Sequence, residues 1–154
     1  MYIRKLWNNQ KKKFFFEVFF VPKKTETKIE IFQLNLIIVL WYMKKKNFKQ
    51  EDITFLISIF LKDLESLCFE VGEAESRIPK KMRKMTENFY GRLISYSKQF
   101  DKIQEKQVSE LSETLKLNFN CEKIKYNEYS KYLRDNIKHF YKFEKKDFHN
   151  LTFF

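Results

Sequence analysis

Seven apolar residues between positions 78 and 100 recur at steps of three and four, which is the spacing of one face of an α-helix. They are Ile78, Met82, Met85, Phe89, Leu93, Tyr96 and Phe100. Four basic residues of the same segment fall largely outside this apolar stripe, and they are Lys80, Lys81, Arg83 and Lys84. The pattern predicts a helix that buries one face and presents a cationic flank to a partner, and it holds no evident catalytic group.

Glycine and proline are rare in this chain, with two of each among 154 residues. Tight sheet turns and glycine-rich phosphate loops need these residues, so a many-stranded sheet is a poor fit. The length suits one domain with a real core. We therefore predict an all-α fold, with a single compact bundle of about five to six helices over residues 1–142 and a frayed tail over residues 143–154.

Apolar periodicity and capping signals predict where the helices lie. The expected ranges are about 2–20, 28–45, 52–71, 79–100, 108–119 and 126–141. The first helix could break near Lys11, and its run Phe14–Phe16 suits a strand equally well. Thr27 and Glu30 have the spacing of a capping box at a helix start. Gly72 follows the third helix where a C-cap is wanted.

The segment 31–43 of the second predicted helix is strongly apolar but only about thirteen residues long, and it carries Gln33 and Asn35. A membrane span needs roughly 20 residues, so we interpret this segment as the buried central helix. Gly91 lies inside the fourth helix, where glycine costs about 1 kcal/mol relative to alanine. We explain it by the close approach of another helix or of a partner's backbone.

The chain is strongly basic, with 31 lysine and arginine residues against 20 aspartate and glutamate residues and a formal net charge of +11. Such an excess suits anionic partners such as RNA, ribosomes or acidic lipid surfaces. Lysine also has codons rich in A and T, as do the abundant Asn, Ile, Phe and Tyr. Nucleotide bias in the genome therefore explains the excess equally well.

Candidate catalytic groups are few. His139 and His149 are the two histidines, and they lack the spacing of metal ligands. Asp63 and Glu65 are two apart on a predicted helix and point to different faces. Because an enzyme needs a convergent acid, base, nucleophile or metal ligand, we expect no enzyme, no catalytic residue, no bound metal and no cofactor.

The stretch from Lys80 to Tyr96 also carries a more particular pattern. A Lys-Lys-Met-Arg-Lys-Met run is followed by Phe89-Tyr90-Gly91-Arg92 and, four residues after the arginine, by a tyrosine. This pattern resembles the ubiquinol–cytochrome c chaperone family. Weaker likeness, for instance at Val71-Gly72-Glu73, extends the resemblance over roughly residues 2–119. The resemblance implies a helical protein that helps assemble respiratory complex III.

The resemblance further implies a non-enzymatic assembly chaperone that binds newly made cytochrome b before it enters ubiquinol–cytochrome c reductase. Its partners would be nascent cytochrome b, the ribosome or a small helper subunit, and peripherally the inner membrane. The likeness begins almost at Met1 and leaves no room for a removable leader, so we expect a bacterial protein in the cytoplasm, at the face of the inner membrane. The mitochondrial matrix and inner membrane are the alternative.

The contact residues that we predict lie on the 78–100 helix. They are Lys80, Lys81, Arg83, Lys84, Tyr90 and Arg92. Phe89 and Gly91 would set the packing that presents these residues to a partner.

Two parts of this prediction stay open. Met82 and Met85 suit adaptable apolar contact with a partner, but ordinary core filling explains them as well. Arg92 could form an internal salt bridge with Asp63 or Glu65 instead of meeting a partner.

The basic flank also supports a function of another class, a helical RNA- or ribosome-binding protein. Its four cations and Arg92, offset by Glu87, give a local net charge of +4 (five minus one), enough for salt-sensitive phosphate binding. A third hypothesis is a peripheral membrane protein whose lysine-rich N-terminus and aromatic residues lie on acidic lipid.

Overall fold

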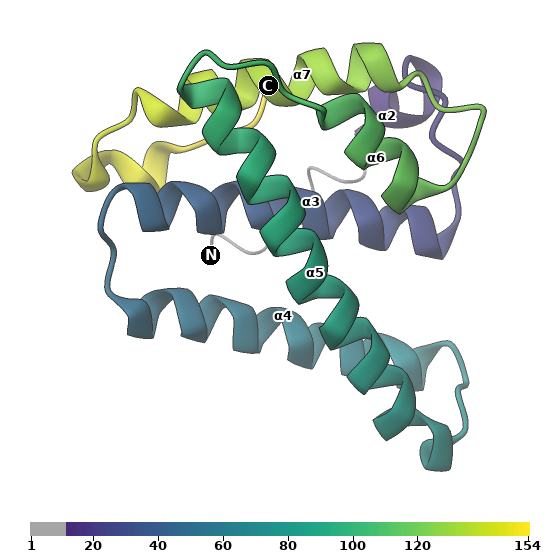
Figure 1. The fold of residues 1–154 in the computed structure, drawn as a ribbon. Helices are drawn as coiled ribbons and strands as arrows, with labels where there is room; N and C mark the ends of the chain where they lie inside the picture. The colour runs from purple at the N-terminus through teal and green to yellow at the C-terminus, as the bar shows by residue number, and fades with distance from the viewer. Residues whose placement is uncertain (1–11) are drawn as a thin grey trace.

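The computed structural model describes residues 12–154, and its helices are drawn in chain order in Figure 1. They are α2 (Lys13–Glu17), α3 (Thr25–Lys45), α4 (Gln50–Glu70), the short 3-10 helix η1 (Glu75–Arg77), α5 (Ile78–Gln104), α6 (Leu111–Phe119), α7 (Tyr126–Tyr141) and the 3-10 helix η2 (Lys145–Asn150). No strand occurs among residues 12–154, so the predicted all-α bundle is confirmed.

The N-terminal part of the chain differs from its prediction. Phe14–Phe16 lie in α2, so the strand alternative for this run is wrong. The helix predicted from about Tyr2 to Phe20 is limited to α2 within the described part of the chain, and its first residues lie outside that part. Phe15 is fully buried, and its ring centroid lies 5.7 Å from that of Tyr129 in α7. This contact anchors α2 to α7.

α3 is the central helix of the bundle, as predicted. All of its residues from Ile31 to Met43 are buried, because α4, α5, α6 and α7 each contact it. α3 begins at Thr25, and the Thr27 hydroxyl accepts a hydrogen bond from the backbone N–H of Lys24 at 3.2 Å. Thr27 is thus the third helical residue and not the cap, so the predicted Thr27–Glu30 capping box is wrong.

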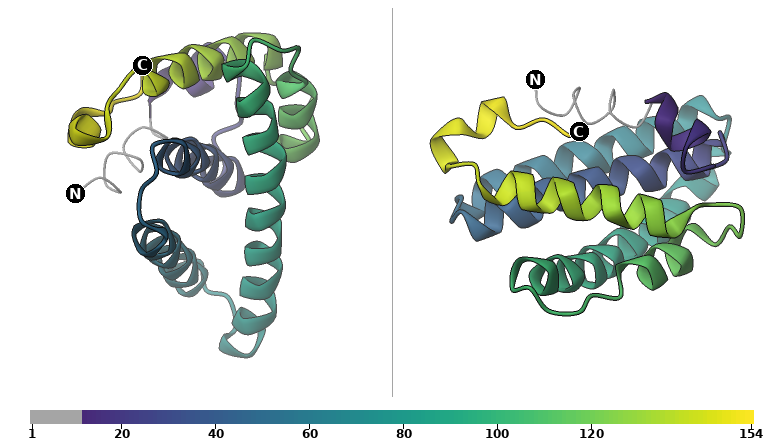
Figure 2. Two further views of the ribbon diagram at one scale, coloured as in Figure 1. Left: turned by 60° about the vertical axis from the view of Figure 1, so that its left-hand side comes forward. Right: turned by 90° about the horizontal axis from the view of Figure 1, so that it is seen from above.

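α4 and α5 complete the lower part of the molecule. α3 and α4 run antiparallel, and α5 crosses both of them (Figure 1, Figure 2). Phe60 of α4 joins the three helices, since its ring centroid lies 5.4 Å from that of Phe32 in α3 and 5.0 Å from that of Phe89 in α5. Gly72 has a φ of 78° just after α4, so the predicted helix end is confirmed.

The C-terminal segment 143–154 folds back along α7 (Figure 2). Leu151 is only 1% exposed, and the Phe148 ring stacks on that of Tyr42 in α3 at 6.2 Å. This packing differs from the frayed tail predicted for these residues, because apolar side chains without helical spacing anchor the segment to the core. The domain boundary at residue 142 stays a prediction.

Gly91 does not accommodate a neighbouring helix from the described residues. A Cβ atom built on it would meet no atom of residues 12–154 within 4 Å. The part of the prediction that placed another helix against Gly91 is therefore wrong for residues 12–154, and the approach of a partner's backbone stays a prediction.

Candidate functional site: a groove with apolar walls and a lysine rim

A groove of about 820 Å³ lies between the C-terminal half of α3, the N-terminal half of α4 and the middle of α5. Its apolar walls are formed by Leu40, Trp41, Ile53, Ile57, Tyr90, Leu93 and Ile94. Its polar lining consists of Lys44, Lys45, Asn47, Gln50, Thr54, Ser97, Lys98 and Asp101. Its volume falls in the range of about 300–1,000 Å³ that is typical of binding pockets.

The lip of the groove on α5 is made of exposed apolar side chains. Ile94 is 73% exposed and its neighbour Tyr90 is also exposed. A single exposed apolar residue on a protein surface is ordinary. Here Tyr90 and Ile94 line the groove together with the half-buried Leu93 of the same helix and the half-buried Ile53 of α4. The apolar lining therefore includes both exposed and partly buried side chains.

An ion pair holds the polar corner of the groove. Lys45 Nζ lies 2.7 Å from Asp101 Oδ1, and the Trp41 indole N–H donates to the same oxygen at 2.9 Å. Partial burial alone would raise the pKa of the Asp101 carboxyl, but these two hydrogen bonds, together with the positive charges of Lys45 and Lys44, outweigh it and lower that pKa. Asp101 therefore stays ionised, neutralises Lys45 and fixes the indole ring of Trp41 as part of the wall.

Two other lysines line the rim of the groove. Lys44 on α3 and Lys98 on α5 are exposed and form no ion pair with any of residues 12–154. With three lysines against one aspartate, the lining of the groove has an excess of two positive charges (three minus one).

The basic residues predicted as contacts do not gather on one face. Lys80 and Lys84 lie on the same strip of α5 as Gly91, because steps of four and seven residues return to one side of a helix. Lys81 lies on another side, where its Nζ is 3.0 Å from a carboxylate oxygen of Glu73. Arg83 is exposed.

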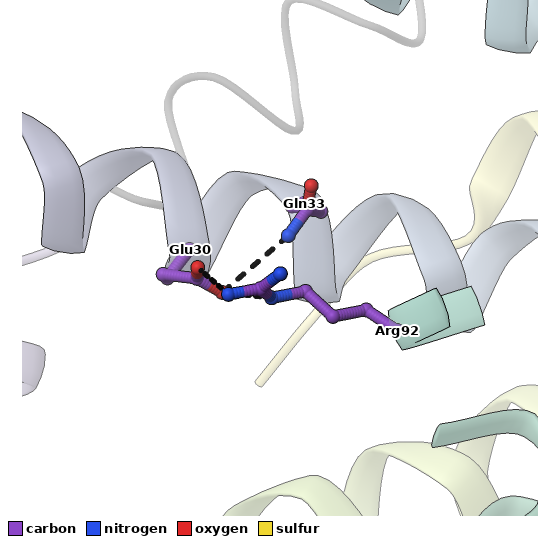
Figure 3. A network of polar contacts seen from close by, with 3 residues as sticks. All are labelled: Glu30, Gln33 and Arg92. Atoms are coloured by element: carbon purple, nitrogen blue, oxygen red, sulfur yellow. Dashed lines mark hydrogen bonds and ion pairs between the residues drawn. The ribbon is translucent and has the colours of Figure 1, made fainter. Parts of the chain in front are cut away.

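Arg92 is bound inside the molecule. Its guanidinium holds Glu30 of α3 with two hydrogen bonds, Nε to Oε2 at 2.9 Å and Nη2 to Oε1 at 2.6 Å (Figure 3). Both side chains are only 17% exposed. The internal salt bridge that the sequence left open thus forms, but the predicted partners Asp63 and Glu65 are wrong, because Arg92 faces α3 where α5 crosses it.

Burial raises the pKa of the Glu30 carboxyl, and the charge and hydrogen bonds of Arg92 offset part of that rise. The Gln33 amide also donates to Glu30 Oε2, at 3.4 Å (Figure 3). The side chains of Met82 and Met85 pack against the hydrophobic core and are also partly exposed, so core filling and partner contact both stay open for them.

The comparison with known proteins agrees with the fold and with the signature on α5. The sequence profile described as ubiquinol-cytochrome C chaperone matches residues 17–153, most of the chain. The chain belongs to the ubiquinol–cytochrome c chaperone family. This is a family of chaperones and not of enzymes. No curated protein matches the sequence.

A solved structure shows the same fold. The crystal structure of the Cbp3 homolog from Brucella abortus is 20% identical in sequence, and the match covers 99% of this chain and 86% of that one with a TM-score of 0.79. Over residues 12–154 of the present family member, none of the helices combines the length and the apolar character of a membrane span. The same residues contain no group of three or more His, Cys, Asp or Glu side chains placed to hold a metal ion.

Sequence reasoning missed most of the groove in this chaperone. Of the predicted contact residues only Tyr90 lines it. One signal was available in the sequence, because Ile94 is an apolar residue on the otherwise polar side of α5, off the stripe that predicts the buried face. Lys44 and Lys98 carry no such signal, since their positions depend on how α3 and α5 cross.

Proposed function

We propose that this chaperone binds newly made cytochrome b and promotes its assembly into ubiquinol–cytochrome c reductase, complex III. The observation that carries the proposal, beside the family, is the apolar groove. An unassembled membrane subunit exposes apolar surface to water, and each 100 Å² of that surface that a chaperone covers is worth roughly 2.5 kcal/mol. The groove offers such cover with Tyr90, Leu93 and Ile94.

The exposed cations of α5 suit a second task in the same protein. Lys80, Arg83 and Lys84 lie on the N-terminal part of α5, outside the groove. Phosphates of a ribosome or of lipid headgroups attract such residues at low ionic strength. The client would then be received where it is made, and we place the protein in a bacterial cytoplasm at the face of the inner membrane.

Co-purification from cells that assemble complex III tests the proposal. The tagged chain is isolated in mild detergent, and the proteins that come with it are identified by mass spectrometry. We expect cytochrome b to be enriched, and Ile94→Asp to reduce the enrichment at least tenfold. Leu117→Asp is the matched control, because Leu117 on α6 is 81% exposed and lies outside the groove. If wild-type protein fails to enrich cytochrome b, the proposal is wrong.

The exposed lysines favour a second candidate, a helical RNA- or ribosome-binding protein. Recovery of ribosomal RNA without cytochrome b, lost in the Lys80→Glu/Lys84→Glu variant and weakened by salt, would support it. RNA binding that survives high salt unchanged would argue against it.

A further inference from the structure

We infer that the groove receives one helix of the client, apolar over about three turns and carrying carboxylates beside Lys44 and Lys98. This inference rests on the proposed function, and it names the feature of the client that the groove recognises.

The length of the groove sets the length of the bound segment. Its wall on α5 runs from Tyr90 to Asp101, eleven residue steps, or about 16 Å at 1.5 Å per residue. A helix that spans a membrane has about 20 residues and a length of about 30 Å. The groove therefore covers roughly half of a membrane span, about three turns of one helix.

The chemistry of the groove sets the pattern of the bound segment. Aliphatic and aromatic side chains from three helices form the walls, and an amphipathic helix meets such walls with residues at i, i+3, i+4 and i+7. A helix is also the form that leaves no unpaired backbone groups against an apolar wall. The bound face should therefore be a stripe of large apolar residues.

The charge of the rim sets the polar part of the segment. Lys45 is already paired with Asp101, whereas Lys44 and Lys98 are in no ion pair with residues 12–154. An acidic side chain of the client would compensate them, and a basic one would be repelled. The chain's own residues 1–11 contain Arg4, Lys5 and Lys11 but no acidic residue, so their charge does not complement the rim.

A second copy of the protein is also a poor occupant by charge. Each copy carries a formal net charge of +11, and like charges oppose association at low salt. The argument therefore favours a client segment of opposite charge.

Peptide binding to the purified full chain tests the inference. Two fluorescent peptides of about 14 residues, long enough for marginal helix formation, share one leucine stripe at i, i+3, i+4 and i+7. They differ only in two polar positions, which hold glutamate in one peptide and lysine in the other. We expect the glutamate peptide to bind about tenfold more tightly in low salt, a difference of about 1.4 kcal/mol that two exposed ion pairs can supply. The difference should shrink as salt rises.

Two double variants locate the effect. Lys44→Glu/Lys98→Glu should remove the preference for the glutamate peptide or reverse it. Lys80→Glu/Lys84→Glu should keep it, although both variants lower the net charge from +11 to +7, because each substitution changes the charge by two units. Ile94→Asp should weaken both peptides.

The inference is overturned if both peptides bind equally, or if the two double variants behave alike. It is also overturned if sedimentation shows wild-type dimers that Ile94→Asp converts to monomers, because the occupant is then a second copy. A selective groove combined with failure to co-purify cytochrome b would reject the proposed function and leave the recognition pattern intact. If cytochrome b co-purifies while both peptides bind equally, the recognition pattern is rejected and the proposed function stands.

Discussion

The central helix α3 is covered differently on two of its sides. The side toward α7 is closed to solvent, since Leu133, Ile137 and Phe140 of α7 are fully buried. Toward α4 and α5 the same kind of side chain is left partly uncovered, with Leu93 half-buried and Ile94 exposed. Both sides are built from aliphatic and aromatic residues, so residue type alone does not distinguish stabilising surface from binding surface.

The arrangement of the covering elements explains the difference. On the closed side, α7 and the segment 143–154 both pack toward α3, as the ring contacts of Tyr42 with Phe140 and Phe148 show. On the open side, α5 crosses α3 and α4 (Figure 1), and the groove lies between these three helices. The closed side should therefore govern stability, and the open side should govern binding.

The largest expected effect is on the closed side. Phe140→Ala should lower the free energy of unfolding by about 3–5 kcal/mol, because it leaves a cavity in the core. Ile94→Ala, at a side chain of the groove that is 73% exposed, should change it by less than about 0.5 kcal/mol. Urea unfolding followed by circular dichroism measures both. Equal losses would abolish the distinction between the two regions.

The next effect concerns the ion pair that joins α3 and α5. Arg92→Met should cost about 3 kcal/mol at neutral pH, since it leaves the buried Glu30 carboxylate without its partner. Lys81→Met, which breaks the more exposed pair with Glu73, should cost less than about 1 kcal/mol. Glu30→Gln added to Arg92→Met should recover part of the loss.

The pH dependence of the Arg92→Met variant provides a second test. Burial raises the pKa of Glu30 above its ordinary value of 4.5, and losing Arg92 raises it further. The folded state then holds this proton more tightly than the unfolded chain, so stability falls as pH rises through the folded pKa and is regained as pH falls. The cost of Arg92→Met should therefore shrink as the pH is lowered from 7 toward 4.5 in unfolding experiments. A cost that does not change with pH would contradict the charged-pair explanation.

A smaller loss should mark the C-terminal segment. Leu151→Ala should lower the free energy of unfolding by about 2–3 kcal/mol, at the low end of the range for buried leucine, because the site lies near a chain end. Leu117→Ala, at an exposed leucine, serves as the control in the same thermal or urea unfolding assay. No difference between the two variants would restore the interpretation of this segment as a frayed tail.

The smallest effect should have the opposite sign. Gly91→Ala should stabilise the free protein by about 1 kcal/mol, because the position is helical and exposed and an added Cβ would meet no atom of residues 12–154 within 4 Å. If a partner's backbone approaches here, the same change should weaken co-purification of cytochrome b. Unfolding and co-purification are measured on the same variant. Stabilisation without loss of client would show that the glycine is not needed for contact.

Most helices could be predicted from the sequence, because helical periodicity is a local property. α7 begins and ends at the predicted residues, Tyr126 and Tyr141, and α5 buries Phe89, Tyr96 and Phe100 as its stripe predicts. The helix start near Thr27 was misplaced by three residues, since the capping signal there can be satisfied in more than one register.

The site was less predictable. Arg92 has several acidic residues within plausible reach in the sequence, and only the crossing of α5 over α3 selects Glu30 as its partner. Tyr90 was identified from the family signature. Trp41 and Ile53 were not identified, because they lie on α3 and α4, and only the packing of these helices against α5 brings them into one groove with Tyr90.

The sequence by itself determined that the chain is helical, which faces of α4, α5 and α7 are apolar, and which family it belongs to through the Phe89–Arg92 signature. These properties depend on residues within a few turns of one another. Only the tertiary structure decided that Ile94 lies in one groove with residues of α3 and α4. It also decided that Lys45 is paired with Asp101, while Lys44 and Lys98 form no ion pair with residues 12–154. The burial of Leu151 in the C-terminal segment is likewise a tertiary property. A groove is a space between helices, and its shape and charge follow from crossing positions that no single helix encodes.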